Sequence, residues 1–562
     1  MKTSNSKTKA FAFLGAAFVL LIALLFTSCP NSAGGGGNSA GGNSGGSSAG
    51  GSSNAGASGG GGETVTVTVK GGEHVTVTKP SFRVPKNSNW NTVRKEALLC
   101  VRYDAGWELE CWRLGNEAGR IVDDTYTATF DTDTTVFAKA SRITKEAVLT
   151  LTPDDNLSIA VKAVTVDNAD IMVDGCTKET LKSGVSTVLT LKKDTESLTL
   201  TGNIIELYCT GNPDNDIRLT ALNVQELSAL QKLDCSENEL TELDVQGLSA
   251  LKHLKCSNNQ LTELNMQGLS TLQKLDCSVN PLTELNVQGL SALKELYCSE
   301  NQLTELHLQG LTALQKLNCG INRLSQLNVQ NVSALQELDC ASNQLTELNV
   351  QNLSALKELK CAKNQLSELN VQNVSALEKL DCAENQLTEL NVQNVNTLKE
   401  LKCASNQLTA LNVQGTTALQ KLDCFRNKLT VLNVQGLSAL KELECMNNRL
   451  TALDVQNLTA LEKLLCRENR LTALNVQGAA ALKELECHNN KLNAHAFCTL
   501  LTGLPKAPSS GAQCILYIEE DSEDNCKDFT SPSQLAEAFR KAKTDKQWKL
   551  FKKNKDYEDV EM

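Results

Sequence analysis

The middle of the chain repeats a 21-residue unit, one copy of which reads Leu293-Lys-Glu-Leu-Tyr-Cys298-Ser-Glu-Asn301-Gln-Leu303-Thr-Glu-Leu306-His-Leu308-Gln309-Gly-Leu311-Thr-Ala313. Its sixth position is always cysteine, and these cysteines follow one another at intervals of 21 residues: Cys235, Cys256, Cys277, Cys298, Cys319, Cys340, Cys361, Cys382, Cys403, Cys424, Cys445, Cys466 and Cys487. A fixed period of this length indicates a solenoid, in which each unit packs only on its neighbours.

The order of apolar residues in the unit resembles the leucine-rich repeat, L-x-x-L-x-L-x-x-N-x-L, with cysteine at the third apolar position. Cys209 begins one further copy ahead of the regular series. We therefore expect about 14 coils over residues 204–493. Stacked at the strand spacing of about 4.8 Å, they would extend on the order of 65 Å.

The unit divides into halves of ten and eleven residues, and each half places L-x-x-L before a short alternation of apolar and polar residues. Such a coil leaves little room for a helix. The pattern resembles the nested bacterial class of these repeats, sometimes called IRREKO. It predicts a mainly β fold, a solenoid with short parallel strands on both faces, preceded by small β modules.

The cysteine ladder points into the core of this solenoid, because each cysteine lies two residues after a buried leucine on the same side of its strand. A buried free cysteine behaves as a small hydrophobe. The chain has no C-x-x-C motif and its five histidines are scattered, so no metal is expected. We expect the ladder thiols to be reduced. The remaining disulfide candidates are Cys100, Cys111, Cys176, Cys498, Cys514 and Cys526.

Two amide rows accompany the ladder: Asn238 to Asn490 after the cysteines, and Gln246 to Gln477 in the second half. Asparagine side chains can satisfy turn backbone that would otherwise be buried without hydrogen bonds. The alternative is a ligand track lined by amides.

The outward positions of the first strand form the candidate binding face. Its later position carries alternating charges that suggest cross-strand ion pairs, while Tyr297 and Leu465 stand out as exposed apolar residues. This row is either a solvated ion-pair ladder or a concave protein-binding surface. It comprises Asp234, Lys255, Asp276, Tyr297, Asn318, Asp339, Lys360, Asp381, Lys402, Asp423, Glu444, Leu465 and Glu486.

The first 62 residues indicate export. Lys2, Lys7 and Lys9 precede the apolar run 11–26, so residues 1–28 are expected to be a signal peptide. The sequence Phe26-Thr-Ser-Cys29 resembles a bacterial lipobox, which implies lipidation of Cys29. Residues 29–62 then combine that cysteine with a Gly/Ser-rich linker, whose composition favours a flexible coil.

Three further segments complete the chain. Residues 63–141 alternate at the strand period, and their Gly106-Trp-Glu-Leu-Glu-Cys-Trp112 and Asp133–Lys139 stretches resemble the small β repeat of internalin-type surface proteins. Residues 142–203 are expected to be a β-rich N-terminal cap, since a solenoid needs its apolar ends covered. Residues 494–562 are expected to be an α/β C-terminal cap.

Composition narrows the function. The formal net charge of −11 argues against a nucleic-acid partner. Two G-x-S-x-G matches within residues 37–46 lie in the linker, where the strand and helix of a nucleophile elbow are missing. We therefore expect neither an enzyme nor a cofactor.

The order of signal, linker, internalin-like module and capped 21-residue repeats resembles that of treponemal leucine-rich-repeat surface lipoproteins of the LrrA type. The resemblance implies a lipid-anchored adhesin of the outer membrane, exposed at the cell surface. Its partners would be host extracellular or epithelial proteins, or surface proteins of other bacteria. The alternative is a structural lipoprotein that organises the envelope without an external ligand.

Overall fold

The computed structural model describes residues 63–562, apart from 105–106, 124–125, 143–144, 152–157, 194, 212–217, 509–510 and 521–524. The predicted signal peptide, Cys29 and the Gly/Ser-rich linker lie outside the described residues.

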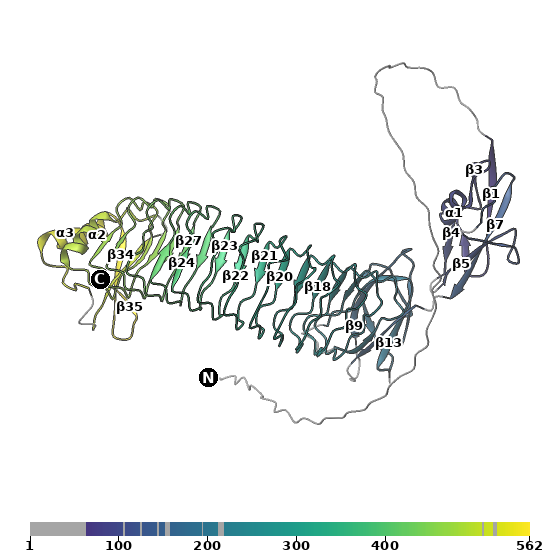
Figure 1. The fold of residues 1–562 in the computed structure, drawn as a ribbon, viewed down its shortest axis with the longest axis horizontal. Helices are drawn as coiled ribbons and strands as arrows, with labels where there is room; N and C mark the ends of the chain where they lie inside the picture. Colours follow the sequence, from purple (N-terminus) through teal and green to yellow (C-terminus); the bar gives the residue numbers. More distant parts are fainter. Residues whose placement is uncertain are drawn as a thin grey trace, which may run out of the picture. The chain divides into compact units, whose positions relative to one another are not determined.

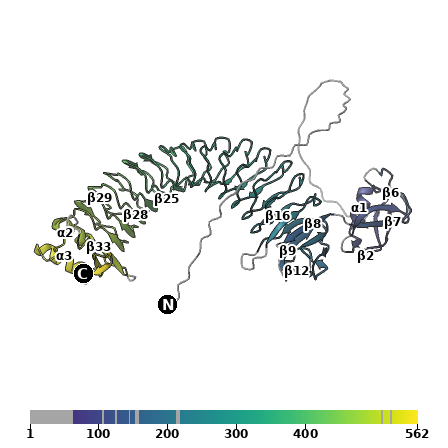
Figure 2. The ribbon, with the colours of Figure 1, turned by 90° about the horizontal axis from the view of Figure 1, so that it is seen from below.

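The solenoid is built on one long parallel sheet, which runs along the inner side of its arc (Figures 1 and 2). Each coil contributes one strand, and neighbouring strands pair in register, as when Leu338 faces Leu359. Counting β14, fourteen such strands are present in the described residues: β14 (Ile204–Tyr208), β16 (Lys232–Asp234), β17 (His253–Lys255), β18 (Lys274–Asp276), β19 (Glu295–Tyr297), β20 (Lys316–Asn318), β21 (Glu337–Asp339), β22 (Glu358–Lys360), β23 (Lys379–Asp381), β25 (Glu400–Lys402), β27 (Lys421–Asp423), β28 (Glu442–Glu444), β30 (Lys463–Leu465) and β32 (Glu484–Glu486). The predicted mainly β solenoid is confirmed.

The second half of the coil is extended, but it pairs into strands at few places. Two parallel pairs occur among the regular coils: β24 (Glu389–Asn391) with β26 (Ala410–Asn412), and β29 (Ala452–Asp454) with β31 (Ala473–Asn475). The arc explains the difference, because the outer side of a curved stack is longer and separates neighbouring backbones. Strands on both faces are therefore present only in part of the solenoid.

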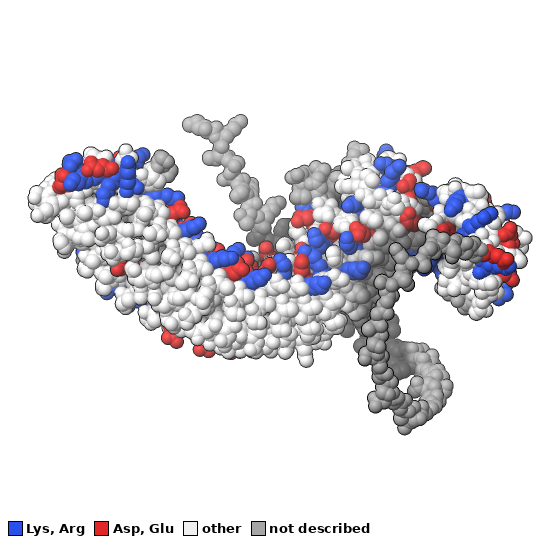
Figure 3. Space-filling view, turned by 90° about the horizontal axis from the view of Figure 1, so that it is seen from above, with Lys and Arg blue, Asp and Glu red and all other residues white. Residues whose placement is uncertain are grey.

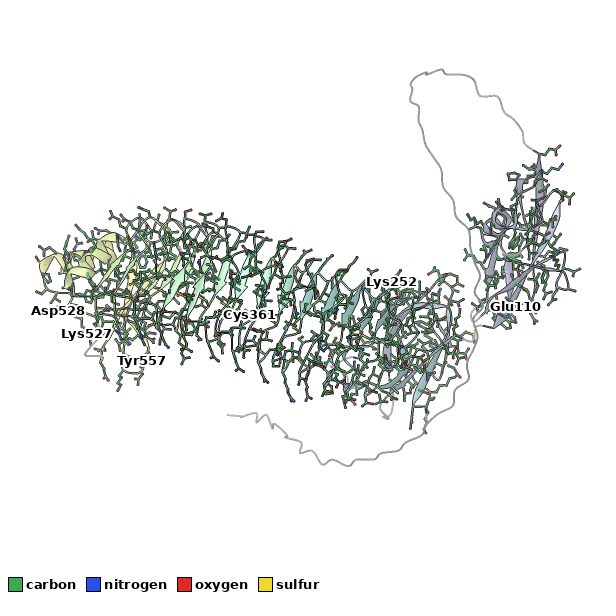
Figure 4. The ribbon with its side chains drawn as sticks, viewed as in Figure 1. Glu110, Lys252, Cys361, Lys527, Asp528 and Tyr557 are labelled. Carbon is green, nitrogen blue, oxygen red and sulfur yellow. The ribbon has the colours of Figure 1, made fainter. Side chains whose placement is uncertain are left out.

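The interior of each coil is filled by leucine, valine and the ladder cysteine. The ladder cysteines are completely buried, and Cys361 lies within the stack in Figure 4. These side chains fill a narrow core without large rings. This packing accounts for the 4 % aromatic content of the chain.

The N-terminal end of the stack is covered by antiparallel strands. β9 (Ser158–Thr165) pairs with β14 and continues the inner sheet, while β8 (Glu146–Leu151) pairs with β15 (Leu219–Asn223), the outer strand of the first coil. β12 (Thr187–Thr190) pairs with β9 and extends the inner sheet, while β10 (Ile171–Asp174), β11 (Thr180–Leu181) and β13 (Ser197–Thr201) join β8 and β15 in a five-stranded sheet.

The C-terminal end continues the sheet with larger side chains. β33 (Ala512–Ile518) pairs in parallel with β32, and β34 (Trp548–Lys553) follows it before β35 (Asp559–Glu561) turns back. Helices α2 (Ala494–Gly503) and α3 (Ser533–Thr544) pack against each other, and α2 contacts β31. Phe497 and Trp548 are buried at this end, so aromatic bulk closes the open end of the core.

Residues 63–142 form a separate small core. Its main sheet has the order β3 (Ser81–Pro85), β1 (Thr64–Gly71), β7 (Thr134–Arg142), β5 (Trp107–Leu114) and β6 (Ile121–Val122). A second pair joins β2 (Val75–Val77) to β4 (Val101–Tyr103), and helix α1 (Trp90–Leu98) buries Trp90 against Trp112 and Phe130. In the part of the chain that the structure describes, no helix is long and apolar enough to span a membrane.

Candidate functional site

The inner sheet presents two outward rows of side chains, which we call the concave face. In each three-residue strand from β16 to β32 the middle leucine is buried, and the first and third residues point outward. Figure 3 shows Lys, Arg, Asp and Glu gathered along this inner edge, while much of the flank beside it carries none of them. The concave face is therefore the charged surface of the coils.

Ion pairs between neighbouring coils organise this face. Lys360 Nζ lies 2.9 Å from Glu358 Oε1 and 3.8 Å from Asp339 Oδ2, and Lys379 Nζ lies 3.6 Å from Glu358 Oε2. The hydrogen bond from Lys360 lowers the pKa of the Glu358 carboxyl below its ordinary value. The predicted ion-pair ladder is present on these coils.

Several acidic members of the predicted row also hold the backbone. Ser236, Ser278, Ala341, Ala383 and Phe425 each donate a backbone N–H to the Asp two residues before it, at 3.1 to 3.3 Å. The accepting residues are Asp234, Asp276, Asp339, Asp381 and Asp423. The aspartates thus fix the turn that follows each strand, besides contributing charge.

The rest of the row is engaged with neighbours. Lys255 lies 3.6 Å from Asp234, Lys402 lies 3.1 Å from Glu400, and Glu444 lies 3.1 Å from Lys463. Glu486 accepts from Arg467 Nε at 2.9 Å. The structure therefore brings the predicted residues together on one surface, where most are paired before any partner arrives.

Asp423 is the acidic residue of this row whose pKa is raised. Burial raises it above its ordinary value, and the carboxylate of Glu444 on the next coil acts in the same direction. The alternation of charges ends at this point, since Asp423 and Glu444 are neighbours of the same sign.

Tyr297 is half-buried rather than freely exposed. Lys274 Nζ lies 5.0 Å from the centre of its ring, and its hydroxyl donates to Glu295 Oε2 at 3.2 Å. The ring is held in place by these two contacts. It presents a rigid aromatic surface on the concave face.

Leu465 was expected to be exposed, and this expectation is wrong. Its side chain is only 7 % exposed. It stands between Glu444 and Glu486, whose ion pairs with Lys463 and Arg467 draw long side chains around it. In a row with a coil spacing of about 4.8 Å, a leucine is covered by the stems of its neighbours.

The row predicted from the sequence leaves out the first position of each strand. These side chains share the ion pairs, as in Lys274 with Glu295 at 2.6 Å, Lys316 with Glu337 at 2.7 Å and Lys421 with Glu442 at 2.9 Å. The alternation of the strand itself was the signal that could have added them, because residues on both sides of a buried leucine point outward.

Behind the face, the asparagine row connects successive coils. Asn259 Nδ2 donates to the carbonyl oxygens of Cys235 and Cys256 at 3.0 and 3.1 Å, and its Oδ1 accepts from Leu240 N at 3.0 Å. Asn259 is only 8 % exposed, as are most of its equivalents. The asparagines of this row are structural and do not line a ligand track, whereas the glutamine row stays a prediction.

The buried thiols have little nucleophilic character. Burial raises the pKa of the cysteines from Cys235 to Cys466 well above the ordinary value, to about 12 for Cys445. The cysteines among the described residues all carry free thiols, including the disulfide candidate Cys100, whose Sγ donates to Glu96 O at 3.2 Å. No cluster of metal-ligating side chains occurs in the described ranges.

A shallow groove of about 770 Å³ lies on the outer side of the coils. It is lined by the repeated Glu, Asn and Gln positions of four neighbouring coils, among them Glu347, Asn349 and Gln351. Its walls are carboxylates and amides, and the repeated leucines Leu327, Leu348 and Leu369 lie between them. It offers hydrogen bonds along a line rather than an enclosed binding cavity.

The in-register strands, the buried leucines and the asparagine row together define the architecture. It is a leucine-rich-repeat solenoid. The solved structures similar to this leucine-rich-repeat chain include bacterial proteins of the same architecture. No protein-family model and no curated protein matches the chain.

Three bacterial proteins illustrate this similarity. The functional domain of InlJ from Listeria monocytogenes, described as including a cysteine ladder, is 30 % identical over 56 % of this chain and 70 % of its own, with a TM-score of 0.49. A leucine-rich-repeat protein of Leptospira interrogans is 27 % identical over 58 % and 91 %, with a TM-score of 0.44. YopM from Yersinia enterocolitica is 28 % identical over 47 % and 61 %, with a TM-score of 0.40.

Proposed function

We propose that this leucine-rich-repeat protein is a lipid-anchored adhesin of the outer membrane, which binds host or bacterial surface proteins through its concave face. The observation that supports this most is the long sheet with two outward rows of charged side chains. The leucine and cysteine core accounts for the buried residues of each strand, and leaves the outward charges available for recognition.

The side chains of these two rows are already held in place before a partner binds, and this favours recognition. Lys360, Glu358 and Lys379 are already fixed by one another, so a partner would order few free side chains on binding. Surface ion pairs add only about 0–1 kcal/mol each to stability, so folding alone gives little reason for so many. Alternating charges would favour a partner whose own charges alternate with the coil spacing.

The binding experiment uses the purified full chain against immobilised host extracellular proteins and bacterial surface proteins. A concave variant carries Tyr297→Ser, Lys360→Gln and Lys402→Gln. Its matched control carries Val431→Ser, Arg323→Gln and Lys363→Gln, which remove one apolar side chain and two cations from the outer side of the coils. We expect the concave variant to lose binding by tenfold or more while the control retains it. Equal losses in both would contradict the assignment of this face.

Anchoring and exposure are tested separately. Radioactive fatty acid should label the wild-type protein and leave Cys29→Ser unlabelled. Protease added to intact cells should cleave the solenoid if it faces the exterior. Complete protection would favour the envelope-organising role instead.

A further inference from the structure

The outer side of the coils changes sign along the solenoid. For each coil we define the outer segment as the residues that follow the ladder cysteine, up to the glutamine that ends the second half. In the nine outer segments between residues 236 and 414, twelve residues are acidic and two are basic. In the segments 425–435, 446–456, 467–477 and 488–491, six are basic and two are acidic.

Two substitutions in each coil produce this change. Earlier coils read Gln-Leu-Thr-Glu, as in Gln344 to Glu347, whereas later coils read Lys428-Leu-Thr-Val431, Arg449-Leu-Thr-Ala452 and Arg470-Leu-Thr-Ala473. In each coil that has Lys or Arg immediately before the leucine of this motif, the residue three positions after that Lys or Arg is not acidic. The earlier coil with Arg323 follows the same rule, since it has Gln326 at that position. Each of these later coils therefore carries a cation with no carboxylate three residues further along the same coil.

The resulting row, Lys428, Arg449 and Arg470, is called the basic ladder. Arg449 and Arg470 are exposed and form no ion pair with any part of the chain that the structure describes. Lys428 Nζ donates to the neutral Gln407 Oε1 at 3.0 Å. Arg449 N donates to Leu429 O and Arg470 N donates to Leu450 O, both at 2.9 Å, so the coils remain hydrogen-bonded at this row and its successive members stand about 4.8 Å apart.

The two acids of this region do not neutralise the ladder. Glu468 is held by Arg467 on one oxygen and by Asn447 Nδ2 at 2.9 Å on the other. Asp454 accepts from Gln456 N at 3.0 Å, which commits one of its oxygens to a local turn. The ladder therefore keeps its positive charge.

A surface hollow adjoins the start of the basic ladder. It has a volume of about 460 Å³ and is lined by Glu384, Ser405, Asn406, Phe425 and Arg426. Phe425 is half-buried, and Arg426 adds a further exposed cation beside Lys428. The aromatic ring of Phe425 can stack on a sugar ring, whose hydroxyl groups can bind Arg426, Ser405 and Glu384. The Glu384 carboxylate lies 3.7 Å from Lys363 Nζ, which offsets its charge.

We propose that the basic ladder and the Phe425 hollow form a second binding site, for a linear polysaccharide that carries an anionic group on successive sugars. Its sulfate or carboxylate groups would meet the guanidinium and ammonium groups in turn, and one sugar would pack in the hollow. Ala452, Ala473 and Val431 leave the polymer room to lie along the row.

Spacing distinguishes this ligand from an extended acidic peptide. Side chains on one face of an extended acidic peptide recur every two residues, about 6.8 Å, which does not match the coil spacing of about 4.8 Å.

The test measures binding of a size-defined heparin hexasaccharide to the purified full chain by calorimetry. The triple variant Lys428→Gln, Arg449→Gln and Arg470→Gln carries the glutamine that earlier coils have at this position, as at Gln365 and Gln386. It should weaken binding tenfold to a hundredfold, because it removes three charge contacts with the polymer. The matched control, Lys252→Gln, Lys357→Gln and Lys441→Gln, removes the same charge from exposed positions outside both binding faces and should bind as wild type.

A second variant keeps the ladder intact. Val431→Glu, Ala452→Glu and Ala473→Glu reinstate the acid of the earlier coils, and should abolish binding without removing a cation. Phe425→Ser should weaken binding of the hexasaccharide and leave that of polyglutamate unchanged. The proposal would be overturned if the wild-type chain bound polyglutamate as tightly as the hexasaccharide. It would also be overturned if the control variant lost as much affinity for the hexasaccharide as the ladder variant does. Dimerisation of the chain that the ladder variant abolishes while hexasaccharide binding persists would overturn it as well.

Discussion

Asn364 binds its coil to the preceding one through Cys340: its Nδ2 donates to the Cys340 carbonyl oxygen at 3.0 Å, and its Oδ1 accepts from Leu345 N at 3.0 Å. A second bond from Nδ2 reaches the carbonyl of Cys361 in its own coil. One buried amide thus satisfies backbone groups of two coils, which neither coil could satisfy alone.

The first prediction concerns this amide. Asn364→Ala should lower the free energy of unfolding by about 2–4 kcal/mol, because it leaves a buried N–H and buried carbonyls without partners. The control Asn370→Ala removes an outer-side amide whose Oδ1 accepts from Gln372 N at 3.1 Å, and should cost less than about 1 kcal/mol. Urea denaturation followed by circular dichroism measures both. If both substitutions lowered the free energy of unfolding by the same amount, the buried asparagine row would have no special role in stability.

The second prediction is alkaline unfolding. The folded pKa of the buried thiols is raised, so the unfolded chain loses its thiol protons first as the pH rises above the ordinary value near 9.0. Stability is then fully present below about pH 9, and falls above it by up to about 1.4 kcal/mol per pH unit for each ionised thiol.

Replacing Cys298, Cys319, Cys340 and Cys361 by alanine should make this decline less steep. The urea midpoint, measured from pH 6 to pH 10.5, gives both slopes. Between pH 6 and 8 the variant and the wild type should show the same slope, which serves as the control. If the urea midpoint of the variant fell as steeply above pH 9 as that of the wild type, the alkaline sensitivity would come from groups outside the cysteine ladder.

The third prediction concerns backbone strain at Val279 and Ile321. Both occupy the turn after the ladder cysteine with positive φ, 55° and 52°, where a β-branched side chain is disfavoured. Equivalent turns carry Asn258 and Asn447. Ile321→Asn should therefore raise the free energy of unfolding by about 1 kcal/mol. The reverse change, Asn447→Val, should lower it, and a null result in both would show that the turn relaxes to fit the side chain.

The fourth prediction is acid sensitivity at the C-terminal end. His488 is 4 % exposed, and its Nδ1 has no hydrogen-bond partner among the residues that the structure describes. Burial lowers its pKa from near 6.5 to about 4, and the charges of Arg467 and Lys553 act in the same direction against that of Asp559. The unfolded chain therefore takes up a proton first, so stability is full above about pH 6.5 and falls towards pH 4, by at most about 3 kcal/mol.

His488→Phe should remove this part of the pH dependence. Hydrogen exchange of the β33 amides, compared at pH 7 and pH 5, measures it locally. A decline of the same size in His488→Phe would assign the sensitivity to other groups. His495→Phe, on the exposed side of α2, provides the control.

The repeat made much of the solenoid predictable. The 21-residue spacing and the apolar pattern predict the parallel inner strands, the buried cysteines and the outward rows, because each coil sees almost the same neighbours. The interval does not predict how tightly the outer halves pair. That depends on the curvature of the whole stack, and only β24, β26, β29 and β31 form outer strands among the regular coils that the structure describes.

The end of the stack shows a second limit. Asn525 lies outside the repeat, yet its Nδ2 donates to Cys487 O at 2.8 Å and its Oδ1 accepts from Leu492 N at 2.8 Å. It supplies the next member of the asparagine row from the cap. A motif search keyed to 21 residues misses it, since the chain returns to this position through α2 and β33.

The sequence by itself determined the period, the inward cysteine and leucine ladders, and the alternation of charges on the strands, because these depend on contacts between identical positions one coil apart. Only the tertiary structure decided which outward residues are available. Leu465 is covered and Tyr297 is held by Lys274 and Glu295, while Arg449 and Arg470 stay without ion pairs in the described chain. Exposure and pairing depend on how long side chains from neighbouring coils fold over one another, and a linear pattern does not contain that information.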